Sequence, residues 1–337
     1  MDEHDGTRVV VVTGASAGVG RATVRAFAEH GADVALIARG RDGLAAAASE
    51  VERSGQRALV ISADVADAQQ MIDAADRVER ELGTIDVWVN NAMTSVFAPF
   101  WEVSPEEFER VTVVTYLGYV NGTRAALRHM RPRGEGVIIQ VGSALAYRSI
   151  ALQSAYCGAK AAIVGFTDSL RAELLHDNSR IRLTAVHLPA HNTPQFRWVR
   201  SRLPREAQPV PPIYQPELAA DAIVWASEND RREIHLGAPA FFAILGQKVA
   251  PGLMDRYVAG TWEAQMIDEP RDTTRPDNLF APVPGDAGAH GVFDERARDS
   301  SPMWLLDRNR VGIAAVATIG IGAAAVAALT GLIRRRP

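Results

Sequence analysis

The strongest constraint on the fold is a repeated alternation between residues 8 and 190 of short β-branched runs with longer, alanine-rich stretches. The short runs are apolar throughout, which is typical of strands that are buried on both faces of a sheet. The longer stretches have the amphipathic pattern of surface helices. Because strand and helix alternate so regularly, we expect an α/β protein with a doubly wound, Rossmann-like parallel sheet and helices on both faces.

These elements can be placed by number. Strands are expected at 8–13, 33–38, 58–62, 85–90, 136–142 and 181–188. Helices are expected at 18–30, 41–54, 67–82, 104–130 and 154–177. After Leu188 a proline-rich stretch predicts a loop excursion, and the rhythm then resumes with a helix at 215–228 and a last strand at 233–237.

The C-terminal third has a different composition. We divide the chain into a catalytic domain at 1–240, a helical segment and Pro/Gly/Asp-rich linker or wrap at 241–302, and a tail at 303–337. In the tail, residues 311–333 carry no charge, and a helix of that length spans about 34 Å. We expect a membrane helix there that anchors a cytoplasmic catalytic domain. The alternative is a buried or surface-lying helix, because Ala, Gly and Thr supply most of the segment.

The composition excludes several other classes of protein. The net charge of the 337 residues is −4 and no basic stripe stands out, so nucleic acid is not an expected partner. The single cysteine, Cys157, excludes an internal disulfide and is read as a packing residue. No Cys/His cluster has the spacing of zinc ligands, so no metal is expected. The polar N-terminus is not a secretory signal.

A glycine-rich turn, "TGASAGVG", directly follows the first expected strand. Glycine lets the backbone amides approach a pyrophosphate closely, and the helix that follows points its free N–H groups at the phosphates. The position between a strand and a helix makes this a phosphate-binding turn rather than a merely structural one. Its expected cofactor-binding residues are Thr13, Gly14, Ser16, Gly18 and Gly20.

The end of the second strand predicts which cofactor is bound. A fold that selects NAD usually places an acidic residue there for the ribose hydroxyls. This chain has Arg39 close to that position, and a guanidinium can bind a 2′-phosphate through charge-assisted hydrogen bonds. We therefore expect NADP(H) rather than NAD(H), with a solvated arginine as the alternative.

The stretch "SAYCGAK" places Tyr156 and Lys160 four residues apart, on one face of an expected helix. A nearby ammonium stabilises phenolate, so we expect it to lower the pKa of the tyrosine and allow proton exchange with an alcohol or carbonyl. Ser143 lies at the carboxyl end of an expected strand, where open α/β sheets place ligand chemistry. The alternative is an ordinary Tyr/Lys pair on a solvated helix.

Together these motifs resemble the short-chain dehydrogenase/reductase family over about residues 8–237. The turn matches that family's TGxxxGxG, the stretch 90–92 matches its NNA, and Ser143, Tyr156 and Lys160 match its catalytic residues in order and spacing. The resemblance implies that Tyr156 is the general acid/base. It also implies that Lys160 binds the nicotinamide ribose and tunes the tyrosine, and that Ser143 orients the substrate.

The resemblance assigns further cofactor contacts. Asp64 and Val65 match positions that contact the adenine, Asn91 and Ala92 match the turn after the fourth strand, and Thr193 lies near the position that contacts the carboxamide. Relatives are often dimers or tetramers, so a homo-oligomer is expected.

Three positions depart from the family pattern. Met93 replaces the glycine of NNAG, and Ala190 replaces the glycine that follows the proline after strand six. Many members carry an asparagine in the helix before strand five, which completes a proton relay through water. Thr115 aligns there, while Asn121 falls on another face. The relay is therefore expected to run through solvent or through the Thr115 hydroxyl.

We predict an NADP(H)-dependent oxidoreductase that interconverts a carbonyl and an alcohol. Five aromatic residues suggest an apolar substrate pocket, or else ordinary packing: Phe97, Phe100, Trp101, Phe196 and Trp198. His187 and His191 are read as structural. A nucleotide-binding scaffold or sensor with weak or no catalysis is the main alternative. Epimerase or dehydratase chemistry is a weaker one, because such relatives have a different glycine spacing.

Overall fold

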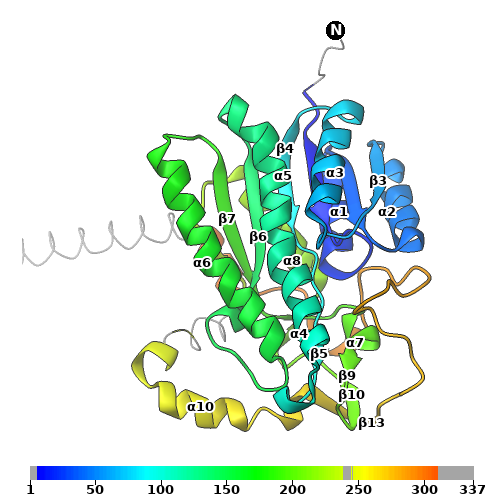
Figure 1. Ribbon diagram of the computed structural model, residues 1–337, viewed down its shortest axis with the longest axis vertical. Coiled ribbons are helices and arrows are strands. Elements are labelled where there is room, and N and C mark those ends of the chain that lie inside the picture. Colours follow the sequence, from blue (N-terminus) through cyan, green and yellow to red (C-terminus); the bar gives the residue numbers. More distant parts are fainter. Residues whose placement is uncertain (1–5, 238–243, 245, 310–337) are drawn as a thin grey trace, which may run out of the picture.

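A seven-stranded parallel sheet forms the centre of the protein, as Figure 1 shows for the computed structural model, which describes residues 6–237, 244 and 246–309. The strand order is β12-β7-β6-β4-β1-β2-β3, and every neighbouring pair is parallel. The predicted doubly wound sheet is thereby confirmed. Its strands are β1 (Val9–Thr13), β2 (Asp33–Ala38), β3 (Ala58–Ser62), β4 (Ile85–Asn90), β6 (Val137–Ser143), β7 (Arg182–Leu188) and β12 (Glu233–His235).

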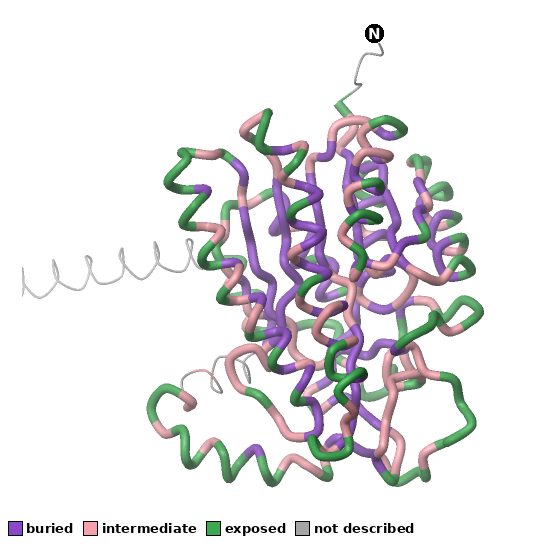
Figure 2. Tube along the Cα trace, in the orientation of Figure 1, coloured by how far each residue is buried: buried purple, intermediate pink, exposed green. Residues whose placement is uncertain are grey.

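Helices cover both faces of this sheet. They are α1 (Gly18–Glu29), α2 (Arg41–Arg53), α3 (Ala68–Glu81), α4 (Pro105–Thr112), α5 (Gly118–Arg133), α6 (Ser154–His176) and α8 (Pro216–Glu228). Side chains of a strand alternate between faces, so Val10 and Val12 join the apolar layer under α1, α2 and α8, whereas Val9 and Val11 join the layer under α3, α5 and α6. Figure 2 shows the result, with buried strands between partly exposed helices.

The helix expected at 104–130 is interrupted, which corrects the prediction. A capping box between Ser104 and Glu107 starts α4, and a π-helical turn, η2 (Val113–Leu117), separates α4 from α5. A π turn accommodates one extra residue without ending the helix, so the apolar periodicity on both sides reads as one continuous helix. Such turns are frequent at functional sites.

The irregular segments after Leu188 pair with one another. The loop excursion contains α7 (Gln195–Trp198), and three small sheets join distant stretches of chain: β8 (Ala190–His191) with β11 (Ile213–Tyr214) and β14 (Ala297–Arg298); β10 (Arg205–Ala207) with β13 (Met266–Pro270); and β5 (Val96–Phe97) with β9 (Arg200–Ser201). The short 3₁₀ turns are η1 (Phe100–Glu102), η3 (Ala144–Ala146), η4 (Glu263–Gln265) and η5 (Asp294–Arg296). The C-terminal stretch therefore returns to the sheet domain.

Two predictions concern the segments around the gaps in the described residues. Of the helical stretch expected at 240–262, the structure contains α10 (Pro251–Ala259), while 238–243 and 245 are outside the described residues. The candidate membrane helix at 311–333 also lies outside them. Within the described part of the chain, no helix has the length and apolar character needed to cross a bilayer.

Candidate active site

One cavity of about 700 Å³ brings the predicted site residues together. It lies at the carboxyl edge of the sheet, where Ser143 ends β6 and the glycine turn follows β1. The predicted residues that line it are Gly14, Ser16, Gly18, Gly20, Arg39, Asp64, Val65, Asn91, Ala92, Ser143, Tyr156, Lys160 and Thr193. Residues from seven different stretches of sequence thus face one space, which is the geometry of a ligand site.

Thr13 is the predicted residue that acts from behind the cavity wall. Its Oγ1 donates to the carbonyl of Val89 over 3.2 Å and accepts from the amides of Asn91 and Ala92 over 2.9 and 3.2 Å. The Asn91 side chain in turn donates to the Thr13 carbonyl over 2.9 Å. Thr13 therefore fixes the glycine turn to the end of β4, and its contribution to ligand binding is indirect.

The glycine turn requires glycine for two reasons. Gly14 and Gly18 have φ of +68° and +59°, a conformation that side chains disfavour. A Cβ on Gly14 would lie 2.9 Å from the Cα of Ala92, so the turn also approaches its neighbour too closely for any other residue. The turn leads into α1, whose N-cap residue Ala17 has no side-chain oxygen to satisfy the first amides. This arrangement fits an anionic phosphate group.

The end of the cavity beside β2 carries a positive balance of charge. Arg39 lies at the end of β2, where its guanidinium donates to the carbonyls of Asn278, Leu279 and Phe280 over 2.5, 3.3 and 3.1 Å. Asp64 is paired with Arg110 over 2.5 Å. Burial and the nearby Arg110 lower the pKa of Arg39. Two guanidinium groups therefore face one carboxylate here.

Residues 278–291, which we call the C-terminal strap, run beside α1 and α2 (Figure 1). The Gly18 amide donates to the Gly288 carbonyl over 3.0 Å, and the Gly285 amide donates to Asp42 over 2.8 Å. Pro282, Val283 and Gly285 line the cavity beside Arg39. The C-terminal strap thus forms a wall of the site, which no motif in the sequence predicted.

Asn121 has a structural role at this end of the site. Its side-chain amide donates to the carbonyls of Val65 and Ala66 over 2.9 and 3.3 Å. It therefore fixes the loop after β3 that carries Val65 into the cavity. Sequence analysis placed Asn121 on another face from the relay position but did not assign it this contact.

Ser143, Tyr156 and Lys160 converge where β6 ends and α6 begins. Burial raises the pKa of the Tyr156 phenol well above its ordinary value, although a hydrogen bond from the Ser143 side chain opposes this effect. Burial also lowers the pKa of Lys160 to about 7. Lys160 is 2% exposed, and its Nζ donates to Tyr119 Oη over 2.9 Å and to the Val141 carbonyl over 2.7 Å.

The expected effect of Lys160 on Tyr156 needs correction. Nζ lies 5.7 Å from the centre of the Tyr156 ring, and its hydrogen bonds go to Tyr119 and Val141. Desolvation of the phenol therefore outweighs stabilisation of phenolate by the ammonium. In the protein without bound cofactor, Tyr156 is therefore a neutral phenol that can donate a proton.

Of the three departures from the family pattern, Thr115 can now be assigned a contact. Its hydroxyl donates to the Thr94 carbonyl over 2.9 Å and accepts from the Thr94 amide over 3.1 Å. Because both hydrogen-bonding functions are used, Thr115 stabilises the turn after β4 and is not placed to relay a proton. Met93 and Ala190 both line the cavity.

The other end of the cavity is apolar, and the set of predicted aromatic residues is only partly correct. Phe97, Phe196 and Trp198 line it. Phe100 and Trp101 do not, and they are 64% and 78% exposed. Side chains that sequence analysis missed complete this end: Leu145, Ile150, Pro209, Val210, Pro211, Pro212, Met254, Tyr257 and Val258. Those from α10 lie more than 90 residues after Lys160, so no motif spacing connected them with the site.

His187 belongs to a polar cluster behind the catalytic loop. Ligand atoms of His187, Glu233 and His235 lie within 4.8 Å of one another, which sequence spacing missed because adjacent strands β7 and β12 bring them together. Tyr147 Oη donates to Glu233 over 2.8 Å and contacts His187 Nε2 over 3.1 Å. Burial lowers the pKa of His187 to about 3. We interpret the cluster as a hydrogen-bond network around His187 that fixes the loop after Ser143.

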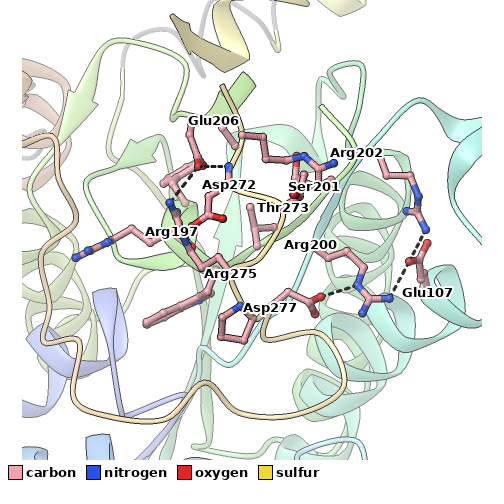
Figure 3. Close-up of a pocket in the computed structure, with 16 residues that line it drawn as sticks. Glu107, Arg197, Arg200, Ser201, Arg202, Glu206, Asp272, Thr273, Arg275 and Asp277 are labelled. Carbon is pink, nitrogen blue, oxygen red and sulfur yellow. Dashed lines mark hydrogen bonds and ion pairs between the residues drawn. The ribbon is translucent and has the colours of Figure 1, made fainter. Parts of the chain in front are cut away.

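A second, charged pocket of about 350 Å³ lies beside the first (Figure 3). Each carboxylate that lines it is paired with a guanidinium group. Glu107 contacts Arg200 and Arg202 over 3.0 and 2.7 Å. Glu206 contacts Arg275 over 3.0 Å. These ion pairs connect the loops around the apolar end of the cavity.

The fold and the site together define a dinucleotide-binding α/β protein, with a glycine turn at the first crossover and a Ser/Tyr/Lys group at the same sheet edge. A family model described as short chain dehydrogenase matches residues 8–203. The chain belongs to this family and is an oxidoreductase.

Individual relatives extend the comparison. An uncharacterized oxidoreductase, YxnA, of Bacillus subtilis is 33% identical over 306 residues, which cover 90% of this chain and 83% of the relative. The similarity therefore continues beyond residue 203 into the C-terminal extension. Cis-4-hydroxycyclohexanecarboxylate dehydrogenase of Sinomonas cyclohexanicum is 35% identical, covering 68% of this chain and 92% of that enzyme. A short-chain dehydrogenase structure from Streptomyces avermitilis has a TM-score of 0.62 at 27% identity, covering 77% of this chain and all of that one.

Proposed function

We propose that this protein is an NADP(H)-dependent oxidoreductase that interconverts a carbonyl and an alcohol, with Tyr156 as the general acid/base. The observation that carries the proposal is the convergence of Ser143, Tyr156 and Lys160 with the glycine turn in one cavity. The similarity to a dehydrogenase whose name specifies a hydroxylated ring as its substrate supports chemistry at a CH–OH group.

The residues present fit a nicotinamide dinucleotide. Gly14 and Gly18, both with positive φ, form the tight turn before α1 that a pyrophosphate site requires, and Lys160 lies where the resemblance places the nicotinamide ribose. Arg39 and Arg110 opposite the single carboxylate of Asp64 favour the extra 2′-phosphate of NADP(H). When bound, the cofactor supplies hydride for reduction or accepts it in oxidation.

The chain's own groups complete the reaction by handling the proton. In reduction, the carbonyl carbon gains hydride and the carbonyl oxygen takes the proton of Tyr156 Oη, which leaves a tyrosinate that recovers its proton from solvent. The neutral phenol carries the proton that this acid role requires. Ser143 Oγ donates a hydrogen bond to the same substrate oxygen and so orients it. For oxidation, Tyr156 would act as the base and take the proton of the alcohol, and a bound oxidised cofactor would favour its phenolate form.

The apolar end of the cavity supports a hydrophobic substrate. Aromatic, proline and methionine side chains from α7, the loop after it and α10 form this end. Such a surface favours carbonyl compounds with a hydrocarbon body over small charged acids. Membrane association through 311–333 and assembly as a homo-oligomer stay predictions, the first from the sequence and the second from the family.

A substrate panel with a matched variant tests this function. We expect the purified protein to oxidise NADPH faster than NADH with some member of a series of ketones, aldehydes and quinones. Tyr156→Phe removes only the exchangeable proton and should lower kcat/KM by about 10²–10⁴-fold. Equal turnover by the two proteins contradicts the mechanism. NADPH binding without turnover on any substrate would favour a nucleotide-binding scaffold.

A further inference from the structure

Lys160 is fixed from the side of α5 by Tyr119. Its Nζ donates to Tyr119 Oη over 2.9 Å and to the Val141 carbonyl over 2.7 Å. Tyr119 Oη itself donates to the same Val141 carbonyl over 2.9 Å. The Lys160 ammonium, the Tyr119 phenol and the Val141 carbonyl therefore form a closed ring of three hydrogen bonds. This ring lies beside Tyr156, which the resemblance assigns as the general acid/base.

The direction of these bonds follows from the chemistry of the groups. The Tyr119 proton is used on Val141, so an oxygen lone pair is left to accept from Lys160. Burial raises the pKa of Tyr119 well above its ordinary value, so it stays a neutral phenol. Two of the three N–H groups of Lys160 are thereby fixed, and the third is left for a group in the cavity, which Lys160 lines.

Tyr119 lies close in sequence to the position at which many family members carry the relay asparagine. The aligned residue, Thr115, uses its hydroxyl on the backbone of Thr94. Tyr119 lies four residues later, just after the π turn, and is 1% exposed. A polar hydroxyl this deeply buried is costly unless it is hydrogen-bonded, and here both of its bonds serve the Lys160 site.

We propose that Tyr119 is a positioning residue that fixes the Lys160 ammonium against the Val141 carbonyl, in place of the water-mediated partner that many family members provide through an asparagine. Tyr119 does not touch the substrate. Its effect on turnover rests on the proposed function, whereas its effect on Lys160 itself does not.

Direct titration of Lys160 separates these two claims. The chain has only two lysines, Lys160 and Lys248, so a protein labelled with ¹³C and ¹⁵N at lysine gives two side-chain signals, which Lys248→Arg assigns. Tyr119→Phe keeps the ring but removes the acceptor, so the midpoint of Lys160 should fall by about one pH unit or more. Tyr116→Phe is the matched control and should leave the midpoint unchanged. Equal Lys160 midpoints in wild type and Tyr119→Phe would overturn the proposal.

Kinetics supply the second readout. If the proposed function holds, Tyr119→Phe should lower kcat by about ten-fold near neutral pH with little change in KM, because less Lys160 is protonated. Its pH–rate profile should shift together with the midpoint. A lower kcat without any shift of the Lys160 midpoint would mean that Tyr119 acts by packing alone, and would also overturn the proposal. If the wild type turns over no substrate, the proposed function fails, and the titration still decides the role of Tyr119.

Discussion

Lys160 is a residue at which burial and hydrogen bonding act in opposite directions. Its side chain is almost fully buried, which disfavours the ammonium and lowers its pKa to about 7. Its bonds to Tyr119 and Val141 recover only part of the lost solvation. A buried lysine of this kind destabilises the folded state, which is common where a charge is needed for chemistry.

This cost predicts how stability depends on pH. Between pH 7 and 10.5 the unfolded chain binds a proton at Lys160 that the folded chain does not, so the stability of the wild type rises with pH in that window. Lys160→Met lacks this term. It should be inactive but more stable than wild type at pH 6.5, and the difference should shrink by about 1 kcal/mol per pH unit between pH 7.5 and 9.

Urea unfolding at pH 6.5, 7.5 and 9 measures this difference. Lys248→Met, at an exposed position, is the control and should follow the wild type. If the free energies of unfolding of wild type and Lys160→Met change with pH in parallel, the pKa of Lys160 is not lowered in the folded protein.

At the scale of elements, α4 connects the two sides of the site through Glu107. This buried carboxylate closes the capping box with Ser104 and pairs with Arg200 and Arg202, on the loop after α7 (Figure 3). Burial alone would raise the pKa of Glu107, but the hydrogen bonds from Arg202, Ser104 and Arg200 outweigh it and lower the pKa to about 2. One side chain thus fixes the start of a helix and a wall of the substrate end.

Glu107→Gln should therefore destabilise the protein at neutral pH by about 3 kcal/mol. The folded carboxyl has a lower pKa than the unfolded one, so its contribution is complete above about pH 4.5 and is lost as pH falls towards 2. The difference in free energy of unfolding between variant and wild type, measured with urea from pH 7 to 3, should become smaller as the pH falls. Glu109→Gln, an exposed change on the same helix, should be neutral. If Glu107→Gln is less stable than wild type by the same amount at every pH, loss of the ion pairs is not the cause.

At the scale of the molecule, the C-terminal extension returns across the sheet domain. After β13 pairs with β10, the strap lies beside Arg39 and the glycine turn, and β14 adds to β11. Trp304, 2% exposed, then packs on α8 with its ring 5.5 Å from Trp225. Ligand in the cavity and the conformation of this extension should therefore depend on each other.

Limited proteolysis tests that dependence. Phe280 is 50% exposed, and its carbonyl is bonded to Arg39. Saturating NADPH should slow chymotryptic cleavage at Phe280 by about ten-fold or more, because ligand binding reduces the open population. Cleavage at Trp101, which is 78% exposed and outside the cavity, is the control and should keep its rate. If NADPH slows cleavage equally at both positions, or does not slow cleavage at Phe280, the conformation of the strap does not depend on cofactor binding.

Local sequence predicted those site residues whose role depends on short-range pattern. Gly14 and Gly18 need positive φ at a strand–helix turn, and Tyr156 and Lys160 share a helix face, so both groups can be identified from spacing. The contacts of Tyr119, Asn121 and the strap could not be predicted in this way. Each joins residues at least 22 positions apart, and nothing in the spacing of those residues specifies the pairing.

The sequence by itself therefore determined the strand–helix alternation, the parallel sheet and the catalytic motif, because periodicity and local conformational preference encode them. Only the tertiary structure decided two features of the site: the pKa values of its side chains, and which segments form its walls. The pKa of Tyr156 depends on how completely packing removes water, and this reverses the direction expected from the neighbouring ammonium. The walls of the site depend on which distant segments fold back over it, as the strap does beside Arg39.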